Sequence, residues 1–192
     1  MKKGKESVID LKPACSHLAA LAGATGAEQM DLPTPCAEYT VGGLLDHLDV
    51  VARGFARLAR GGRDLGAGDD GGGQGRGELG GLLAELGRAW DDPAAWQGGA
   101  EAAGVELPRA VWGRIALTEV VVHGWDLARA TGRGFDPPEE AVRACLEHVA
   151  DFVPKAPVPE LWGRPFHVAD DAPPLDKALA IGARTDILFP VE

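Results

Sequence analysis

The fold is decided by residues 110–131, AVWGRIALTEVVVHGWDLARAT. This segment is rich in good helix formers, and it is followed directly by Gly132, the residue type that most often ends a helix. Its middle, IALTEVVVHGWDLA, is apolar on almost every side of the helix that it predicts. A helix that is apolar all round is a buried helix, so we expect this one at the centre of a helical bundle.

Outward from this segment, the sequence predicts further helices that each have one apolar face. Thr40 is a good N-cap, and the helix after it places Leu44 and Leu48 at helical spacing. Farther along, we expect Asp136 to cap a helix that has Pro137 as its first residue. These further helices span about residues 10–22, 41–60, 78–90, 136–152 and 175–182.

The segments between the helices predict little regular structure. Residues 61–77 are so rich in Gly that we expect a flexible surface loop, and no GxxxxGK[ST] pattern marks a phosphate site there. The strand candidates are residues 104–108, GVELP, and residues 166–169, FHVA. We therefore predict an all-α fold in a single domain, residues 1–192, with residues 155–192 forming a tail that packs on the bundle.

Composition and charge exclude several classes of function. The formal net charge of the 192-residue chain is −10, and no basic stripe is present. This argues against nucleic acid and against an anionic membrane surface as partners. The three cysteines are widely spaced, and neither a signal peptide nor a membrane-spanning apolar run is apparent. We expect a cytoplasmic protein with reduced thiols.

The central helix carries two residues that are able to perform chemistry. Glu119 and His123 are four positions apart, so their side chains lie on one helix face, about 6 Å apart along the axis. Burying a carboxylate without a partner is costly, so Glu119 has to be paired, protonated or bound to a metal. His47, at the edge of the apolar face of the helix after Thr40, is the candidate partner. Two imidazoles and a carboxylate suit Zn²⁺, Ni²⁺ or Fe²⁺, with an open position for water or substrate.

Other interpretations of these residues remain open at this point. Glu119 and His123 can form a buried hydrogen-bonded pair with no metal, and a lone histidine on an apolar face is often a core residue. The remaining histidines, His17, His148 and His167, show no comparable arrangement, and we interpret them as surface or packing residues.

Three stretches of the sequence resemble one known family. They are residues 32–48, LPTPCAEYTVGGLLDHL, residues 116–133, ALTEVVVHGWDLARATGR, and residues 171–184, DAPPLDKALAIGAR. Together they are similar to the mycothiol-dependent maleylpyruvate isomerase N-terminal family, within the DinB-like superfamily. The resemblance implies a four-helix bundle in which a histidine of the second helix and an acidic residue plus a histidine of a later helix hold one metal ion. Those positions match His47, Glu119 and His123.

The same resemblance implies the chemistry. It indicates a metal-dependent thiol transferase or isomerase that acts on a small electrophilic substrate, with mycothiol as the low-molecular-weight thiol. The alternative is a non-catalytic protein that binds a metal or a small ligand on the same scaffold. The sequence departs from the family in residues 61–77 and shows no counterpart of the large C-terminal domain of the full-length isomerase, so the resemblance does not by itself imply maleylpyruvate isomerisation.

Several residues near these motifs have weaker functional interpretations. Arg129 is a candidate contact for an anionic substrate, and Asp126 is expected to bond Arg129 or a neighbouring loop. Trp125 is expected either to line the pocket or to pack. Cys36 lies before a helix N-terminus, where a thiolate is stabilised, but we favour packing for it. The oligomeric state is predicted to be a monomer or a homodimer.

Overall fold

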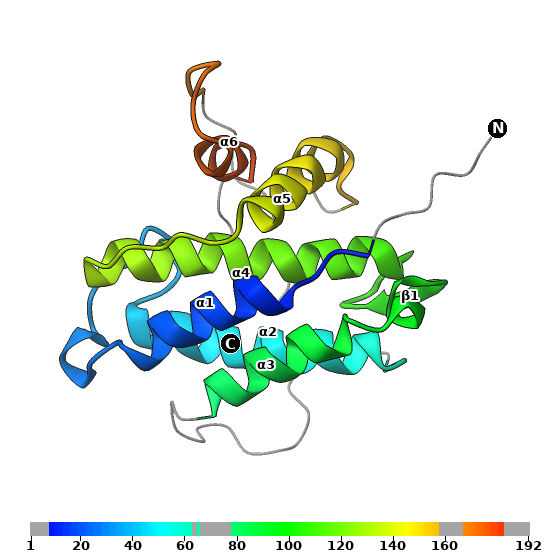
Figure 1. Cartoon of the computed structure of the whole chain (residues 1–192), viewed down its shortest axis with the longest axis horizontal. Coiled ribbons are helices and arrows are strands. Elements are labelled where there is room, and N and C mark those ends of the chain that lie inside the picture. Colours follow the sequence, from blue (N-terminus) through cyan, green and yellow to red (C-terminus); the bar gives the residue numbers. More distant parts are fainter. Residues whose placement is uncertain (1–7, 63–64, 66–77, 158–166, 183–192) are drawn as a thin grey trace.

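Four helices form the body of the protein. The computed structural model describes residues 8–62, 65, 78–157 and 167–182. The four helices are α1 (Lys12–Gly23), α2 (Val41–Ala59), α3 (Leu79–Ala89) and α4 (Arg109–Thr131). α1 packs against α3 and α4, and α2 packs against the same two helices, so the four enclose one apolar core (Figure 1). The predicted all-α bundle is confirmed.

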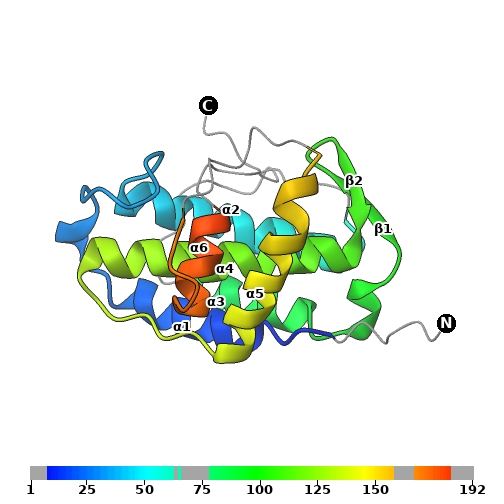
Figure 2. The same cartoon turned by 90° about the horizontal axis from the view of Figure 1, so that it is seen from above.

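α4 is covered on a second side as well. α5 (Glu139–Phe152) packs on α4, and α6 (Pro174–Ile181) packs on α5, outside the four-helix ring (Figure 2). Neighbours on both sides explain why α4 is apolar nearly all round, and most of its residues are buried. Among the described residues, no helix combines the length and the apolar character that crossing a membrane requires.

Two predicted helix ends are confirmed at the level of individual bonds. The side-chain oxygen of Thr40 accepts a hydrogen bond from the backbone N–H of Gly43 at 3.3 Å, which caps α2. Gly132 follows α4 with φ +68°, in the left-handed region that glycine adopts without steric cost. Local sequence signals alone therefore determine where α2 begins and where α4 ends.

The predicted start of α5 is wrong. Asp136 does not cap this helix, which begins at Glu139. The residue before it, Pro138, has an extended backbone conformation with φ −53° and ψ 136°. The cause is the Pro137–Pro138 pair, because a residue that precedes a proline is disfavoured in the helical region. Pro137 therefore cannot serve as the first helical residue, and the helix starts two positions later.

The strand predictions are half right. Residues 105–108 form β2 (Val105–Pro108), which pairs antiparallel with β1 (Gly99–Ala102), a strand of low β-propensity that the pattern did not predict. The turn between them uses Ala103 at φ +50° and Gly104 at φ +72°, as a two-residue hairpin requires. Residues 167–169 form no strand, and Phe166 lies outside the described residues.

Other connections are short or fall outside the described residues. Single 3₁₀ turns occupy Ala27–Gln29, Pro93–Trp96 and Val153–Lys155. Most of the predicted glycine-rich loop, residues 63–64 and 66–77, lies outside the described residues, as do residues 158–166 and 183–192 of the predicted tail. The described part of that tail includes α6, which packs on α5.

His148 on α5 makes the stability of the fold sensitive to acid. It is buried, its ring stacks on Phe152 with centroids 5.1 Å apart, and its Nε2 has no hydrogen-bond partner among the described residues. Burial lowers the pKa of His148 to about 4; the nearby Arg114 adds to the effect and Asp151 opposes it. An unfolded histidine has a pKa of about 6.5. Below that pH the unfolded chain takes up a proton that the folded protein does not, so stability falls as the pH is lowered from about 6.5 toward 4.

We expect a His148→Leu variant to lose this acid sensitivity. His148 lowers the free energy of unfolding by roughly 2 kcal/mol at pH 5, and this loss vanishes above about pH 7. Urea unfolding of the wild type and the variant, followed by circular dichroism at pH 5 and pH 7.5, measures it. The free energy of unfolding should drop less on acidification in the variant. An identical drop in both proteins would assign the effect to other groups.

Candidate metal centre

Three predicted site residues come together inside the bundle. His47 lies on α2, and Glu119 and His123 lie one turn apart on α4. The Nε2 atoms of His47 and His123 lie 3.3 Å and 3.2 Å from the same atom, Glu119 Oε2. One ligand atom of each residue lies within 4.8 Å of the other two, and all three side chains are buried. The structure thus places two imidazole nitrogens and one carboxylate oxygen around one point.

The packing of α2 against α4 produces this convergence. The two helices run side by side (Figure 2). His47 lies on the buried face of α2, between Leu44 and Val51 in the sequence. Glu119 and His123 share one face of α4, because four residues turn a helix through slightly more than one revolution. That face is turned toward His47 on α2. The rings of His47 and His123 meet edge to face, with centroids 4.9 Å apart. The buried faces of α2 and α4 therefore bring His47 and Glu119 together, although they are 72 positions apart in the chain.

Each histidine is held at its other ring nitrogen by a side chain that the sequence analysis did not assign to the site. Tyr39 Oη lies 3.0 Å from His47 Nδ1, and Asp126 Oδ2 lies 3.2 Å from His123 Nδ1. Asp126 is fully buried beside His123, a contact that comes in addition to the predicted bond with Arg129 or a neighbouring loop. The three-residue spacing from His123 to Asp126 on one helix is a signal that points to this pair. No comparable spacing points to Tyr39.

The loop before α2 brings Tyr39 to the site. Pro33 and Thr40 form an isolated antiparallel bridge, and the Thr34 hydroxyl lies within hydrogen-bond distance of the carbonyls of Cys36 and Tyr39. The Tyr39 ring lies against α2 beside Gly43, where an added Cβ would be 3.4 Å from Tyr39 Cδ1. From this position the phenol ring stacks on the imidazole of His47, with centroids 4.9 Å apart.

The electrostatics of the group favour charged forms despite burial. Burial by itself would raise the pKa of Glu119, but hydrogen bonds from His123 and His47 outweigh it and hold the pKa well below its ordinary value. Burial would likewise lower the pKa of His123, but hydrogen bonds to Asp126 and Glu119 raise it well above the ordinary value.

The structure does not bring Arg129 together with the three clustered residues. Arg129 is exposed, and its guanidinium lies 5.9 Å from the centre of the Trp125 ring. Six residues separate it from His123, which places it about 120° around the helix axis from that ligand. Trp125, two residues after His123, also points away from the ligand face of α4 and is partly buried. Both residues therefore belong to a different side of α4.

The cysteines and the other histidines lie outside the cluster. Cys15, Cys36 and Cys145 are all buried. Burial raises the pKa of Cys15 and of Cys145 to about 12, which suits packing and not nucleophilic chemistry. Cys36 is 1 % exposed, as its predicted packing role requires. His17 and His167 are exposed, and His148 is buried on α5.

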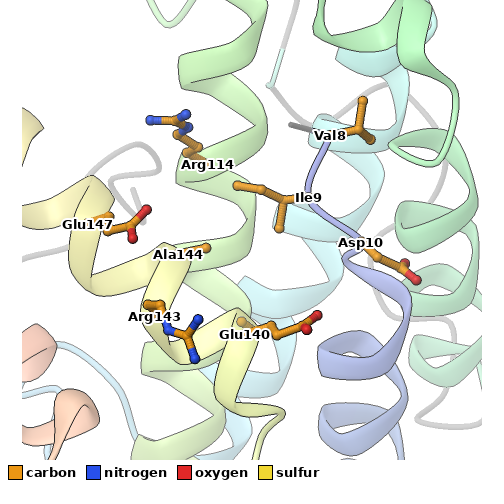
Figure 3. A pocket seen from close by; sticks show the side chains of 9 residues that line it. Val8, Ile9, Asp10, Arg114, Glu140, Arg143, Ala144 and Glu147 are labelled. Carbon is orange, nitrogen blue, oxygen red and sulfur yellow. The ribbon is translucent and has the colours of Figure 1, made fainter. Parts of the chain in front are cut away.

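A groove elsewhere on the molecule is separate from this cluster. It has a volume of about 290 Å³ and lies between the segment before α1, the α4 residue Arg114, and α5 (Figure 3). Its rim consists largely of exposed charged side chains, and Arg143 there is paired with Glu139 at 2.7 Å. None of the three clustered residues lines it. The three clustered residues are buried between α2 and α4, apart from this groove.

Comparison with known proteins places this geometry in a family. The family model of the mycothiol maleylpyruvate isomerase N-terminal domain matches residues 11–128, which include all three clustered residues. Uncharacterized proteins of Mycobacterium tuberculosis strains CDC 1551 and H37Rv are each 30 % identical to this chain over 174 residues, which cover 87 % of this chain and 91 % of the relative. No solved structure gives a significant match. The chain belongs to the mycothiol maleylpyruvate isomerase N-terminal domain family, within the DinB-like superfamily.

Proposed function

We propose that His47, Glu119 and His123 hold one divalent metal ion, with zinc the best candidate and nickel or iron also compatible. The observation that carries this proposal is the convergence of two Nε2 atoms on one carboxylate oxygen in a buried position. This set of donors is one that catalytic zinc sites use, with a further position left for water or substrate. The same set is compatible with the other two metals.

The spacing of the donor atoms is compatible with a shared metal ion. In a tetrahedral zinc site with bonds of about 2.0–2.1 Å, neighbouring donor atoms lie about 3.3 Å apart. The two separations from Glu119 Oε2 are 3.3 Å and 3.2 Å. Hydrogen bonds among these side chains reach similar lengths, so the metal content of the protein decides between the two arrangements.

We further propose that the protein is a metal-dependent thiol transferase or isomerase that works in the cytoplasm. The family description names mycothiol, so the proposed thiol is mycothiol and the second substrate is a small electrophile. A divalent cation supplies Lewis acidity, which lowers the pKa of a thiol or water that binds to it. The chain contributes the three ligands, the groups that orient them, and a buried setting in which electrostatic interactions are strong.

The first experiment determines whether metal is present. Protein purified without a His-tag and without added metal should contain about one equivalent of a divalent ion per chain by elemental analysis. A His17→Gln variant is the matched control, because it removes an exposed histidine outside the cluster and should keep the metal. Protein without metal, even after incubation with zinc, nickel or iron(II), would show that the Glu119–His123 pair is only structural.

The second experiment separates catalysis from binding. The metal-loaded protein is incubated with mycothiol and a panel of small electrophiles, including maleylpyruvate, and adducts or isomers are followed by chromatography. Turnover that depends on both the metal and the thiol is expected. Full metal content with no turnover on any electrophile would favour the alternative, a non-catalytic protein that binds a metal or a small ligand.

A further inference from the structure

Both histidines of the cluster have a partner at Nδ1, but the two partners differ in chemistry. Tyr39 presents a neutral phenol to His47 at 3.0 Å, and Asp126 presents a carboxylate to His123 at 3.2 Å. A phenol is able to donate or accept a hydrogen bond, whereas an ionised carboxylate only accepts. The two partners therefore constrain their histidines in different ways.

Asp126 fixes the hydrogen of His123. Because its carboxylate only accepts, Nδ1 of His123 has to carry a hydrogen, and Nε2 is then the nitrogen that offers a lone pair to a cation. Asp126 is fully buried and lies three residues along α4 from His123, so helix and core packing together hold it in place. Its negative charge also makes the imidazole a stronger electron donor.

Tyr39 allows His47 to carry its ring hydrogen on either nitrogen, Nδ1 or Nε2. When an ionised Glu119 accepts a hydrogen bond from Nε2 of a neutral His47, the Tyr39 hydroxyl donates to Nδ1. With a cation on Nε2, Nδ1 carries the hydrogen and the same hydroxyl accepts it. The hydroxyl serves both states, and the ring stack between Tyr39 and His47 holds the imidazole plane in either one.

We propose that Asp126 and Tyr39 are positioning residues of unequal weight for the metal ion. Asp126 sets both the hydrogen position and the donor strength of His123, whereas Tyr39 sets only the orientation of the His47 ring. This inference rests on the proposed metal site at His47, Glu119 and His123. It assigns to two residues a role that concerns the affinity and the electronic state of the ion, and not only the stability of the fold.

The test compares Asp126→Asn with Tyr39→Phe in the full chain. Zinc affinity is measured by competition with a chromophoric chelator, after circular dichroism has shown that each variant is folded. Asp126→Asn keeps the size but loses the charge and should weaken zinc binding about 10- to 100-fold. Tyr39→Phe keeps the ring and should weaken binding less than about 10-fold, because the stacking remains.

The cobalt(II) form provides a readout that a purely structural role would not change. The visible absorption of bound cobalt should shift in Asp126→Asn and stay close to that of the wild type in Tyr39→Phe. If Asp126→Asn does not fold, Asp126→Glu takes its place, because it keeps the charge but displaces the carboxylate. Asp126→Glu should still lower the zinc affinity more than Tyr39→Phe does.

The outcomes distinguish the inference from the metal site itself. An unchanged zinc affinity and cobalt spectrum in the Asp126 variant, with a wild type that binds zinc, would overturn the inference and leave the site intact. Equal losses in the Asp126 and Tyr39 variants would also overturn it. A wild type that binds neither zinc nor cobalt would instead remove the proposed function on which the inference rests.

Discussion

Replacing Glu119 with glutamine is expected to reduce bound metal from about one equivalent per chain to less than about a tenth. Glutamine keeps the size of the side chain but removes the only anionic ligand of the three. The loss of zinc affinity should exceed the 10- to 100-fold that is typical of changes to groups outside the ligand shell. Elemental analysis of the purified variant and chelator competition measure the effect, and thiol-dependent turnover should disappear with the metal.

A carboxylate outside the cluster gives the matched control for this substitution. Glu147→Gln changes an exposed residue in the groove of Figure 3 and should keep both the metal and the wild-type affinity. Full metal stoichiometry in Glu119→Gln would show that Glu119 is not a ligand. Circular dichroism of the metal-free proteins checks that the variant is folded, because glutamine is still able to hydrogen-bond with the two histidines.

Replacing Trp112 with alanine is expected to lower the free energy of unfolding by about 3–5 kcal/mol. The side chain is fully buried, its ring lies 6.3 Å from that of Phe55 on α2, and its indole N–H donates to the carbonyl of Ala100 at 2.9 Å. It thus joins α4, α2 and the hairpin at one point. Urea unfolding followed by circular dichroism at 222 nm measures the loss, which is a large part of the 5–15 kcal/mol typical of a domain.

Trp90 allows the packing and hydrogen-bond contributions of Trp112 to be separated. It is also fully buried, but its indole N–H has no partner among the described residues. Trp112→Phe and Trp90→Phe remove similar apolar area, and only the first also breaks a hydrogen bond. We expect Trp112→Phe to cost about 1 kcal/mol more than Trp90→Phe. A larger loss in Trp90→Phe would contradict this assignment.

Much of the bundle follows from local sequence signals because those signals agree with the packing. The apolar composition of α4 on all sides predicts neighbours on all sides, and α1, α2 and α5 provide them. Thr40 and Gly132 mark helix ends through their own hydrogen bonds and φ angle. The missed strand β1 is different, because Gly99–Ala102 forms a strand only through its pairing with β2.

Some residues of the candidate site are likewise predictable from local sequence, and others depend on the packing of the helices. The spacing of Glu119 and His123 predicts a shared helix face, and the cost of an unpaired buried carboxylate predicts a partner. That the partner is His47 depends on the packing of α2 on α4, which periodicity does not specify and which the family resemblance supplied. Tyr39 cannot be predicted in this way because its place depends on the loop before α2, whereas the three-residue spacing from His123 to Asp126 does indicate their contact.

The 72-residue separation between His47 and Glu119 gives the proposed ion a mechanical role in addition to a chemical one. An ion bound to both α2 and α4 acts as a crosslink that exists only while metal is available. Binding to the folded state alone would add about 2.7 kcal/mol to stability when free metal is a hundred times the dissociation constant. The metal-loaded protein would then resist unfolding and proteolysis better than the metal-free form.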